Sequence, residues 1–248
     1  MNTHPCKVIS PDNLLASFEA AIKENSANEL AATSGGRHKR SVGKWSKFWG
    51  NGRTLNITFV NAETKELRKQ SEGIIRQWEP STNLTFKFDQ KLNGDIRIKT
   101  GAQTNESYVG TDATLAPADE PTLSLLVDPQ NVDFEWTILH EFGHALGLQH
   151  EHLHPKANIP WDRPKVYDYY KTNYQWTEEQ VYYNLFTLFP TADFMQGPYD
   201  KESIMHYVVP NELTFGDWEV PRNTRISKLD RRNMRKAYPK PNTTPCLK

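Results

Sequence analysis

This sequence has few cysteines, no long apolar run and no net charge. The 248 residues contain two cysteines, Cys6 and Cys246, which stand near opposite ends and could join the termini, but two cysteines say little about the redox compartment. No apolar run approaches the roughly 20 residues of a transmembrane helix, so we expect no membrane partner. Lysine plus arginine and aspartate plus glutamate each number 30, and this zero net charge argues against a nucleic-acid partner.

The first thirty residues also lack the apolar core of a secretory signal. Their apolar stretch Leu14-Leu15-Ala16 is interrupted at once. The sequence therefore predicts either a cytoplasmic protein or one secreted without such a signal, and it leaves extracellular action open. With 37% apolar residues, a chain of this length can form one domain of about 200 residues with an appendage, and we expect a monomer.

The most informative segment that is present reads HEFGHALGLQH at residues 140–150. His140 and His144 are four residues apart and therefore project from the same face of a helix. Gly147 can adopt the left-handed conformation that ends the helix, so that His150 supplies a third nitrogen. Three protein ligands leave the fourth tetrahedral position of a catalytic zinc ion for water. Glu141, next to the first ligand, is placed to accept a proton from that water.

The alternative interpretation is a histidine-rich amphipathic helix whose imidazoles are satisfied in the core. It explains neither Glu141 nor Gly147, whereas the pattern H-E-x-x-H-x-x-G-x-x-H is the metzincin signature. That signature also requires a methionine turn downstream. The segment SIMHY at residues 203–207 supplies one, with Met205 at its centre.

With these two motifs the sequence resembles the astacin-like branch of the metzincin zinc metalloendopeptidases, in a divergent microbial or fungal form. SIMHY is the methionine turn of that branch, and Glu151, directly after the third histidine, fits its longer signature. The resemblance implies one catalytic Zn²⁺ ion with Met205 as an apolar floor beneath it. It also implies that the phenol of Tyr207 is a fifth zinc ligand at rest and stabilises the oxyanion during the reaction.

The resemblance implies an α+β fold: an upper mixed β-sheet with two long helices, one carrying the zinc motif, a lower subdomain that is mostly irregular and helical, and the active-site cleft between them. Alternating apolar residues predict strands at 55–60, 84–88 and 95–99. Apolar residues at helical spacing predict helices at 63–78 and 132–146.

We divide the chain into an N-terminal extension (1–44), a catalytic domain (45–240) and a C-terminal tail (241–248). The extension contains a short helical stretch and ends in the basic run RHKR at residues 37–40. This run could be a nuclear signal, or it could be a processing site at which a propeptide is released. We prefer a third interpretation, a solvated linker. Cys6 could block the zinc ion as a thiolate, although one thiol is all that argues for this.

The segment from Ser107 through Tyr108, Val109 and Gly110 looks like the family's upper-rim edge strand, with residues 122–126 as its neighbour. An exposed sheet edge has unpaired N–H and C=O groups to which an extended peptide can add as another strand. We therefore predict that Tyr108, Val109 and Gly110 contact the substrate.

Two departures from the family stand out. The chain lacks the two disulfides of the animal enzymes, and HLHPK at residues 152–156 replaces the usual continuation Arg-x-Asp-Arg-Asp after the third histidine. His152 and His154 could belong to a second metal site. We prefer to place them at the surface or against the ligands, and we do not expect His206 to be a ligand.

The sequence thus predicts a zinc metalloendopeptidase that hydrolyses internal bonds of protein or peptide substrates through a zinc-bound water, with Glu141 as general base. One alternative is a metal-binding, protease-like module that captures protein partners without turnover. The presence of Glu141 argues against it. A second alternative is a zinc hydrolase of small peptides or other amides, against which the open edge strand argues.

Overall fold

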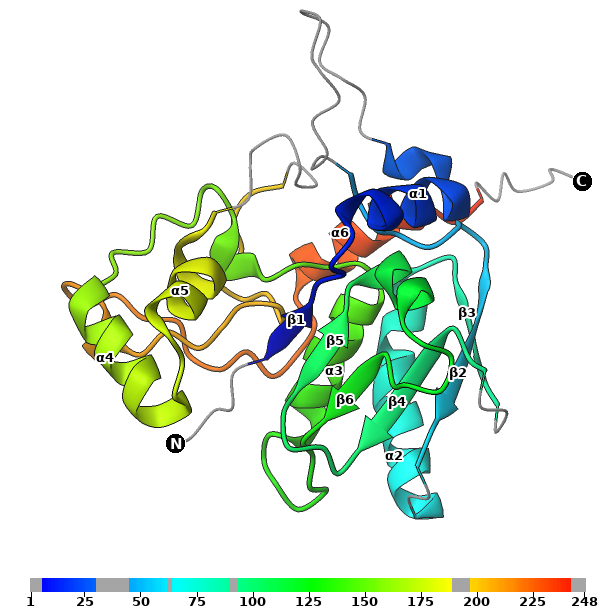
Figure 1. Cartoon of the computed structure of the whole chain (residues 1–248), viewed down its shortest axis with the longest axis horizontal. Helices are drawn as coiled ribbons and strands as arrows, with labels where there is room; N and C mark the ends of the chain where they lie inside the picture. The colour runs from blue at the N-terminus through cyan, green and yellow to red at the C-terminus, as the bar shows by residue number, and fades with distance from the viewer. Residues whose placement is uncertain (1–5, 30–44, 62–63, 90–92, 189–196, 242–248) are drawn as a thin grey trace, which may run out of the picture.

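The computed structural model describes residues 6–29, 45–61, 64–89, 93–188 and 197–241. The basic run at 37–40 and Cys246 lie outside the described residues. Two lobes are visible, with the N-terminal strand β1 between them (Figure 1). One lobe contains the sheet and the helices α2 and α3, and the other contains α4 and α5. In the described part of the chain, no helix combines the length and the apolar character needed to cross a bilayer.

A mixed sheet forms the first lobe, in the order β1-β5-β6-β4-β2-β3. Neighbouring strands run parallel except β5 and β6, which are antiparallel. The strands are β1 (Lys7–Ile9), β2 (Thr54–Phe59), β3 (Thr85–Phe88), β4 (Ile96–Thr100), β5 (Glu106–Tyr108) and β6 (Leu123–Leu125). The apolar residues of β2 and β4 are buried, so that these strands form the centre of the core.

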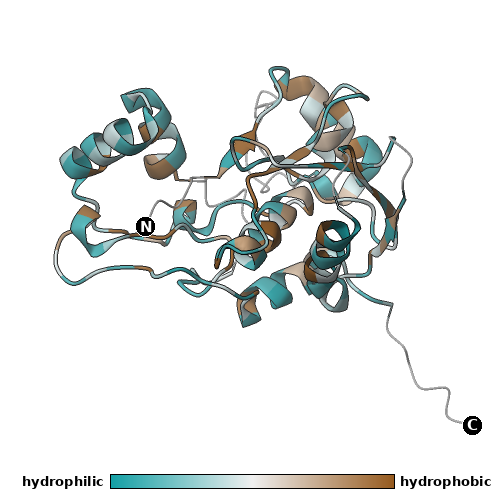
Figure 2. Cartoon of the chain, turned by 90° about the horizontal axis from the view of Figure 1, so that it is seen from below, coloured by the Kyte–Doolittle hydropathy of each residue, from teal (hydrophilic) through white to brown (hydrophobic). Residues whose placement is uncertain are grey.

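The helices are α1 (Leu14–Glu24), α2 (Lys65–Ile75), α3 (Phe134–Ala145), α4 (Arg163–Tyr174), α5 (Glu178–Val181) and α6 (Lys228–Ala237). Helix α3 packs against α2 and against β5 and β6. Its residues are buried almost all round, which is unusual for a surface helix and typical of one enclosed by the core. Apolar residues are concentrated in the lobe that contains the sheet, whereas the residues of the other lobe are largely hydrophilic (Figure 2).

The predicted helix at 63–78 is shorter in the structure. Thr64 caps α2 by accepting a hydrogen bond from the Leu67 N–H, and the helix gives way at Arg76 to a 3-10 helix that continues to Ser81. Pro80 lies in this last turn, where it has no N–H to donate and its ring would clash with the carbonyl four residues earlier. The signal that ends the α-helix was therefore present in the sequence.

The structure differs from the predicted open edge strand in two respects, although the predicted neighbour at 122–126 is present as β6, antiparallel to β5. Strand β5 ends at Tyr108, and Gly110 begins a 3-10 helix with φ +48°. A side chain at Gly110 would collide with the carbonyl of Lys47, so glycine is required by close backbone approach rather than by a substrate strand. The outer side of β5 is also already paired, because Val8 of β1 lies opposite Ser107 in a parallel ladder.

Candidate metal centre

The zinc motif lies on α3 and in the turn that follows it. After the helix, Gly147 has φ +101°, its N–H donates to the His144 carbonyl (2.8 Å), and the Leu148 N–H donates to the Gly143 carbonyl (3.0 Å). The bond from Leu148 to Gly143 spans the left-handed residue, as in the Schellman motif that ends a helix at glycine. The chain then turns back, and His150 comes to lie against the helix.

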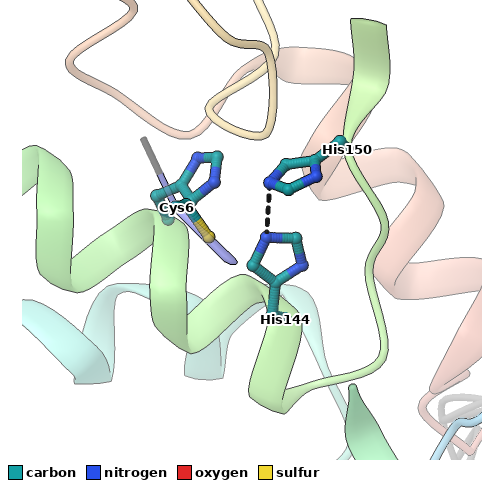
Figure 3. Close-up of side chains that lie close together, drawn as sticks. Cys6, His144 and His150 are labelled. Atoms are coloured by element: carbon teal, nitrogen blue, oxygen red, sulfur yellow. Dashed lines mark hydrogen bonds between the residues drawn. The ribbon is translucent and has the colours of Figure 1, made fainter. Parts of the chain in front are cut away.

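Four buried side chains meet at this point: Cys6, His140, His144 and His150. One potential ligand atom from each lies within 4.8 Å of all the others. Figure 3 shows the Cys6 sulfur beside the facing rings of His144 and His150, whose Nε2 atoms are 3.0 Å apart. The Nε2 atom of His140 is buried and has no hydrogen-bond partner among the described residues.

These donor atoms fit a zinc ion. Zinc binds imidazole nitrogen at about 2.0–2.1 Å and thiolate sulfur at about 2.3 Å in tetrahedral sites, which places two ligand nitrogens about 3.3 Å apart. The His144 and His150 nitrogens are close to that separation. An unpartnered buried nitrogen is costly unless something binds it, and a cation between the four side chains would satisfy the Nε2 atom of His140.

Backbone carbonyls orient two of the imidazoles. The Nδ1 atom of His140 is 2.8 Å from the Ile204 carbonyl, and that of His144 is 2.8 Å from the Leu148 carbonyl. A carbonyl oxygen only accepts, so each Nδ1 carries the hydrogen and each Nε2 presents a lone pair to the centre. Burial lowers the pKa of His140 to about 4 and lowers the pKa of His144 and of His150 well below the usual value. The rings are therefore neutral, as metal ligands must be.

Glu141 faces the same centre and contacts Cys6. The thiol donates to Glu141 Oε2 across 3.2 Å, and both side chains are buried. Burial raises the pKa of Glu141 to about 8, and burial also raises the pKa of the Cys6 thiol well above its usual value. Cys6 is a free thiol in the structure. The strand pairing of β1 with β5 carries it to the centre, and no local pattern in the sequence predicts that placement.

The methionine turn lies under α3. Met205 is buried, and a side chain at Gly143 would collide with its sulfur, so the glycine two positions after Glu141 leaves the room that Met205 fills. Sequence reasoning missed this role of Gly143. Tyr207 packs its ring against His150, with centroids 4.4 Å apart, and its hydroxyl donates to the backbone carbonyl of Cys6. The phenol therefore holds the same residue whose thiol enters the metal centre.

The histidines after the third candidate ligand are buried rather than superficial. His152 is fully buried, stacks on Tyr207 with centroids 4.2 Å apart, and makes a 2.8 Å hydrogen bond through Nε2 to the Asn184 carbonyl. His154 is also buried. Of the two positions expected, the surface one is excluded and the one against the ligands holds for His152, whose ring centroid lies 5.2 Å from that of His150, because a 3-10 helix at Glu151–Leu153 folds this loop back into the protein.

His206 lies outside the group of four. Its Nε2 atom is 2.7 Å from the Tyr199 hydroxyl and its Nδ1 atom is 2.6 Å from the Tyr207 carbonyl. Of the three residues predicted to contact substrate, Tyr108 ends β5, whereas Val109 and Gly110 follow it and are buried. The structure thus brings together a larger set around the metal centre, namely His140, Glu141, His144, His150, Met205 and Tyr207, and it adds Cys6.

Comparison with known proteins defines the class. A family model for astacin, described as a peptidase family, matches residues 41–238. The chain therefore belongs to the astacin family of zinc metallopeptidases, whose cofactor is one zinc ion. The predictions of the family, of the α+β fold and of the zinc cofactor are confirmed.

Individual relatives agree with this assignment. Zinc metalloproteinase nas-26 of Caenorhabditis elegans is 26% identical over 167 residues, which are 57% of this chain and 36% of that protein. The chain thus matches little more than a third of that curated relative.

Three solved structures are similar as well. A structure of myroilysin is 35% identical, with a TM-score of 0.74, and the match covers 79% of this chain and 97% of that one. A crystal structure of myroilysin is 33% identical with a TM-score of 0.60, covering 87% and 96% of the two chains. High choriolytic enzyme 1, a hatching enzyme zinc-protease from Oryzias latipes, is 17% identical with a TM-score of 0.53, covers 76% of this chain and 92% of that one, and supports the fold alone.

Proposed function

We propose that this chain is a zinc metalloendopeptidase that hydrolyses internal peptide bonds of proteins, and that its N-terminal segment holds it inactive. His140, His144 and His150 would be the zinc ligands. The observation that carries the proposal is the convergence of three buried, neutral imidazoles with a buried carboxylate at one point. The same residue types at this spacing are the signature of metal-assisted hydrolysis.

Zinc, when bound, supplies the Lewis acidity that polarises a carbonyl and acidifies water. Glu141 would transfer protons during the reaction. Burial raises its pKa to about 8, so the ionised side chain is a stronger base than an exposed carboxylate; it can take a proton from the attacking water and return it to the leaving amine. Glu141 follows His140 directly in the same helix, so the base and the first ligand have a fixed separation.

Tyr207 would stabilise the charge that develops on the substrate oxygen. Its hydroxyl already donates to a peptide carbonyl, that of Cys6, directly beside the proposed ligand His150. A substrate carbonyl in the same place would receive the same hydrogen bond. A donor that is positioned before the reaction needs no reorganisation when the oxyanion forms, and this is where such a bond lowers the barrier most.

The N-terminal segment occupies both places that a substrate needs. Cys6 offers its sulfur as a fourth ligand where water would otherwise bind, and β1 covers the edge of β5 to which an extended peptide would add. We infer that activation requires release of residues 6–9. The basic run at residues 37–40 precedes the first residue of the family match, Ser41, and is the candidate cleavage site in the sequence.

Cleavage of denatured casein by the full-length Cys6→Ala variant tests this function. We expect cleavage with zinc, loss of cleavage with a chelator, and long fragments in the mass spectrum of the products. Release only of terminal residues, or hydrolysis only of short peptides, would contradict an endopeptidase. Chelator-sensitive capture of casein without any cleavage would favour the non-catalytic binding module instead.

A further inference from the structure

A continuous chain of hydrogen bonds connects His140 to a carboxylate on α6. The His140 Nδ1–H donates to the Ile204 carbonyl (2.8 Å), which belongs to the peptide whose N–H is that of Met205. This N–H donates to Ser203 Oγ (3.0 Å), and the Ser203 hydroxyl donates to Asp230 Oδ1 (2.7 Å). All three bonds run in the same direction, from the imidazole to the carboxylate.

We infer that Asp230 is a positioning residue for zinc binding, which acts on His140 through Ser203 and the Ile204–Met205 peptide. The inference rests on the proposed function, because it takes His140 as a ligand. Metal-bound histidines commonly donate their second N–H to a carboxylate, which fixes the ring and raises the basicity of the ligating nitrogen. Here one peptide and one hydroxyl lie between the imidazole and the carboxylate. Hydrogen bonds in such a chain polarise one another, so the carboxylate strengthens the bond at His140 Nδ1.

The other contacts of Asp230 fix the same turn. Its second oxygen, Oδ2, accepts from the Ile204 N–H (2.8 Å) and from the Ser227 N–H (2.9 Å). The Oδ2 atom thus holds the peptide before Ile204, and the Ser203 hydroxyl, bound to Oδ1, holds the peptide after it, so the carbonyl that faces His140 has little freedom to rotate. Asp230 is only 5% exposed, and none of the ion pairs within the described residues includes it.

Helix capping alone does not explain this arrangement. Asp230 is the third residue of α6 and forms a capping box with Ser227, which requires only the Oδ2 atom and the Asp230 N–H. The bond from Ser203 to Oδ1 contributes nothing to that cap. A buried carboxylate carries a large desolvation penalty, and burial indeed raises the pKa of Asp230. The hydrogen bond from Ser203 to Asp230 therefore fixes the methionine turn and, through this turn, orients His140.

The test is the zinc affinity of the full-length protein, measured by competition with a chelator. Asp230→Asn keeps the size of the side chain but removes its charge and one acceptor. Ser203→Ala breaks the chain while leaving the Oδ2 contacts in place. We expect each variant to raise the Kd for zinc by about 10- to 100-fold. The Nδ1 resonance of His140 in ¹⁵N spectra of the zinc-loaded protein should shift in both variants, because its hydrogen bond weakens.

Ser227→Ala is the matched control. It removes the hydroxyl that caps α6 and accepts from the Asp230 N–H, but it leaves every bond between His140 and Asp230 intact. We expect it to lower the melting temperature of the zinc-free protein while the Kd stays within about twofold of the parent, since a lost cap weakens the fold only modestly. An equal rise of the Kd in Ser227→Ala would reduce Asp230 to a structural role and overturn the inference.

Two outcomes separate this inference from the function on which it rests. If His140→Ala does not weaken zinc binding, the proposed ligand set fails. If His140→Ala abolishes binding but Ser203→Ala and Asp230→Asn bind zinc like the parent, the ligand set stands and the positioning role is wrong. Should Ser203→Ala fail to fold, Asp230→Asn decides the question by the same comparison of Kd and resonance.

Discussion

The two halves of the metal centre are built from different kinds of contact. Helix α3 sets the spacing of His140, Glu141 and His144 by helix geometry, and the Ile204 carbonyl then orients the His140 ring. Cys6 and Tyr207 contact each other although they are 201 residues apart, and they depend on strand pairing and on packing between lobes. The difference teaches that, on the proposed function, the ligand half can stay in place while the N-terminal segment with Cys6 is released and Tyr207 remains beside His150. A latent enzyme needs this separation.

The largest loss of activity should come from a substitution in the local half, which helix α3 positions. Glu141→Gln keeps the size of the side chain and removes the base, so we expect casein turnover to fall by about 10²- to 10⁴-fold in a Cys6→Ala background. Zinc content should stay at that of the parent, because Glu141 is outside the ligand group. Metal analysis and a turnover assay on one preparation check both points. Turnover that survives in the metal-loaded variant would remove Glu141 from the mechanism.

Tyr207→Phe tests the distant half in the same background. The variant loses only the hydroxyl, so we expect kcat to fall by about 10²- to 10³-fold with little change in KM. The ring contact with His150 remains, and the zinc affinity should therefore change little. Steady-state kinetics over a range of substrate concentrations separates the two parameters. A rise in KM at constant kcat would assign the phenol to substrate binding instead.

Cys6→Ala by itself tests how strongly the distant half closes the site. We expect the full-length variant to cleave casein at least about tenfold faster than the parent, which corresponds to a shift of about 1.4 kcal/mol in the equilibrium between closed and open forms. In cobalt-loaded protein, the charge-transfer absorption of a thiolate ligand should be present in the parent and absent in the variant.

Lys7→Ala is the control for Cys6→Ala. It alters the neighbouring side chain and leaves the backbone pairing of Lys7 with Glu106 unchanged. Its activity and its cobalt spectrum should match those of the parent. If Cys6→Ala also matches the parent in both measurements, the thiol does not close the site.

The same division explains what the sequence could predict. The spacing of His140, Glu141, His144 and Gly147 is meaningful within one helix and one turn, so local rules placed all four correctly relative to one another. The strands β2, β3 and β4 alternate in polarity and were equally readable. By contrast, β1 has three residues, and its partner β5 lies about a hundred positions further along the chain.

Pairing of that kind is decided by the whole fold and leaves no local pattern. For this reason the sequence could raise Cys6 as a possible zinc ligand but could not place it at the centre, and it could not predict the covered edge of β5. The sequence left open whether His152 lies at the surface or against the ligands for a related cause. Its burial follows from the 3-10 helix at Glu151–Leu153 and from the contact with Asn184, and neither has a periodic signature in the sequence.

The smallest expected effect concerns the turn after α3, which belongs to the local half. Gly147 has φ +101°, and a Cβ there would lie 2.7 Å from the Phe48 ring, so Gly147→Ala should destabilise the protein by about 1–3 kcal/mol in urea unfolding. Gly73→Ala is its counterpart in α2, where a Cβ meets nothing within 4 Å, and it should stabilise by about 0.5–1 kcal/mol. If Gly147→Ala is as stable as the parent, the left-handed turn is not what fixes His150 against α3, and the local half needs another explanation.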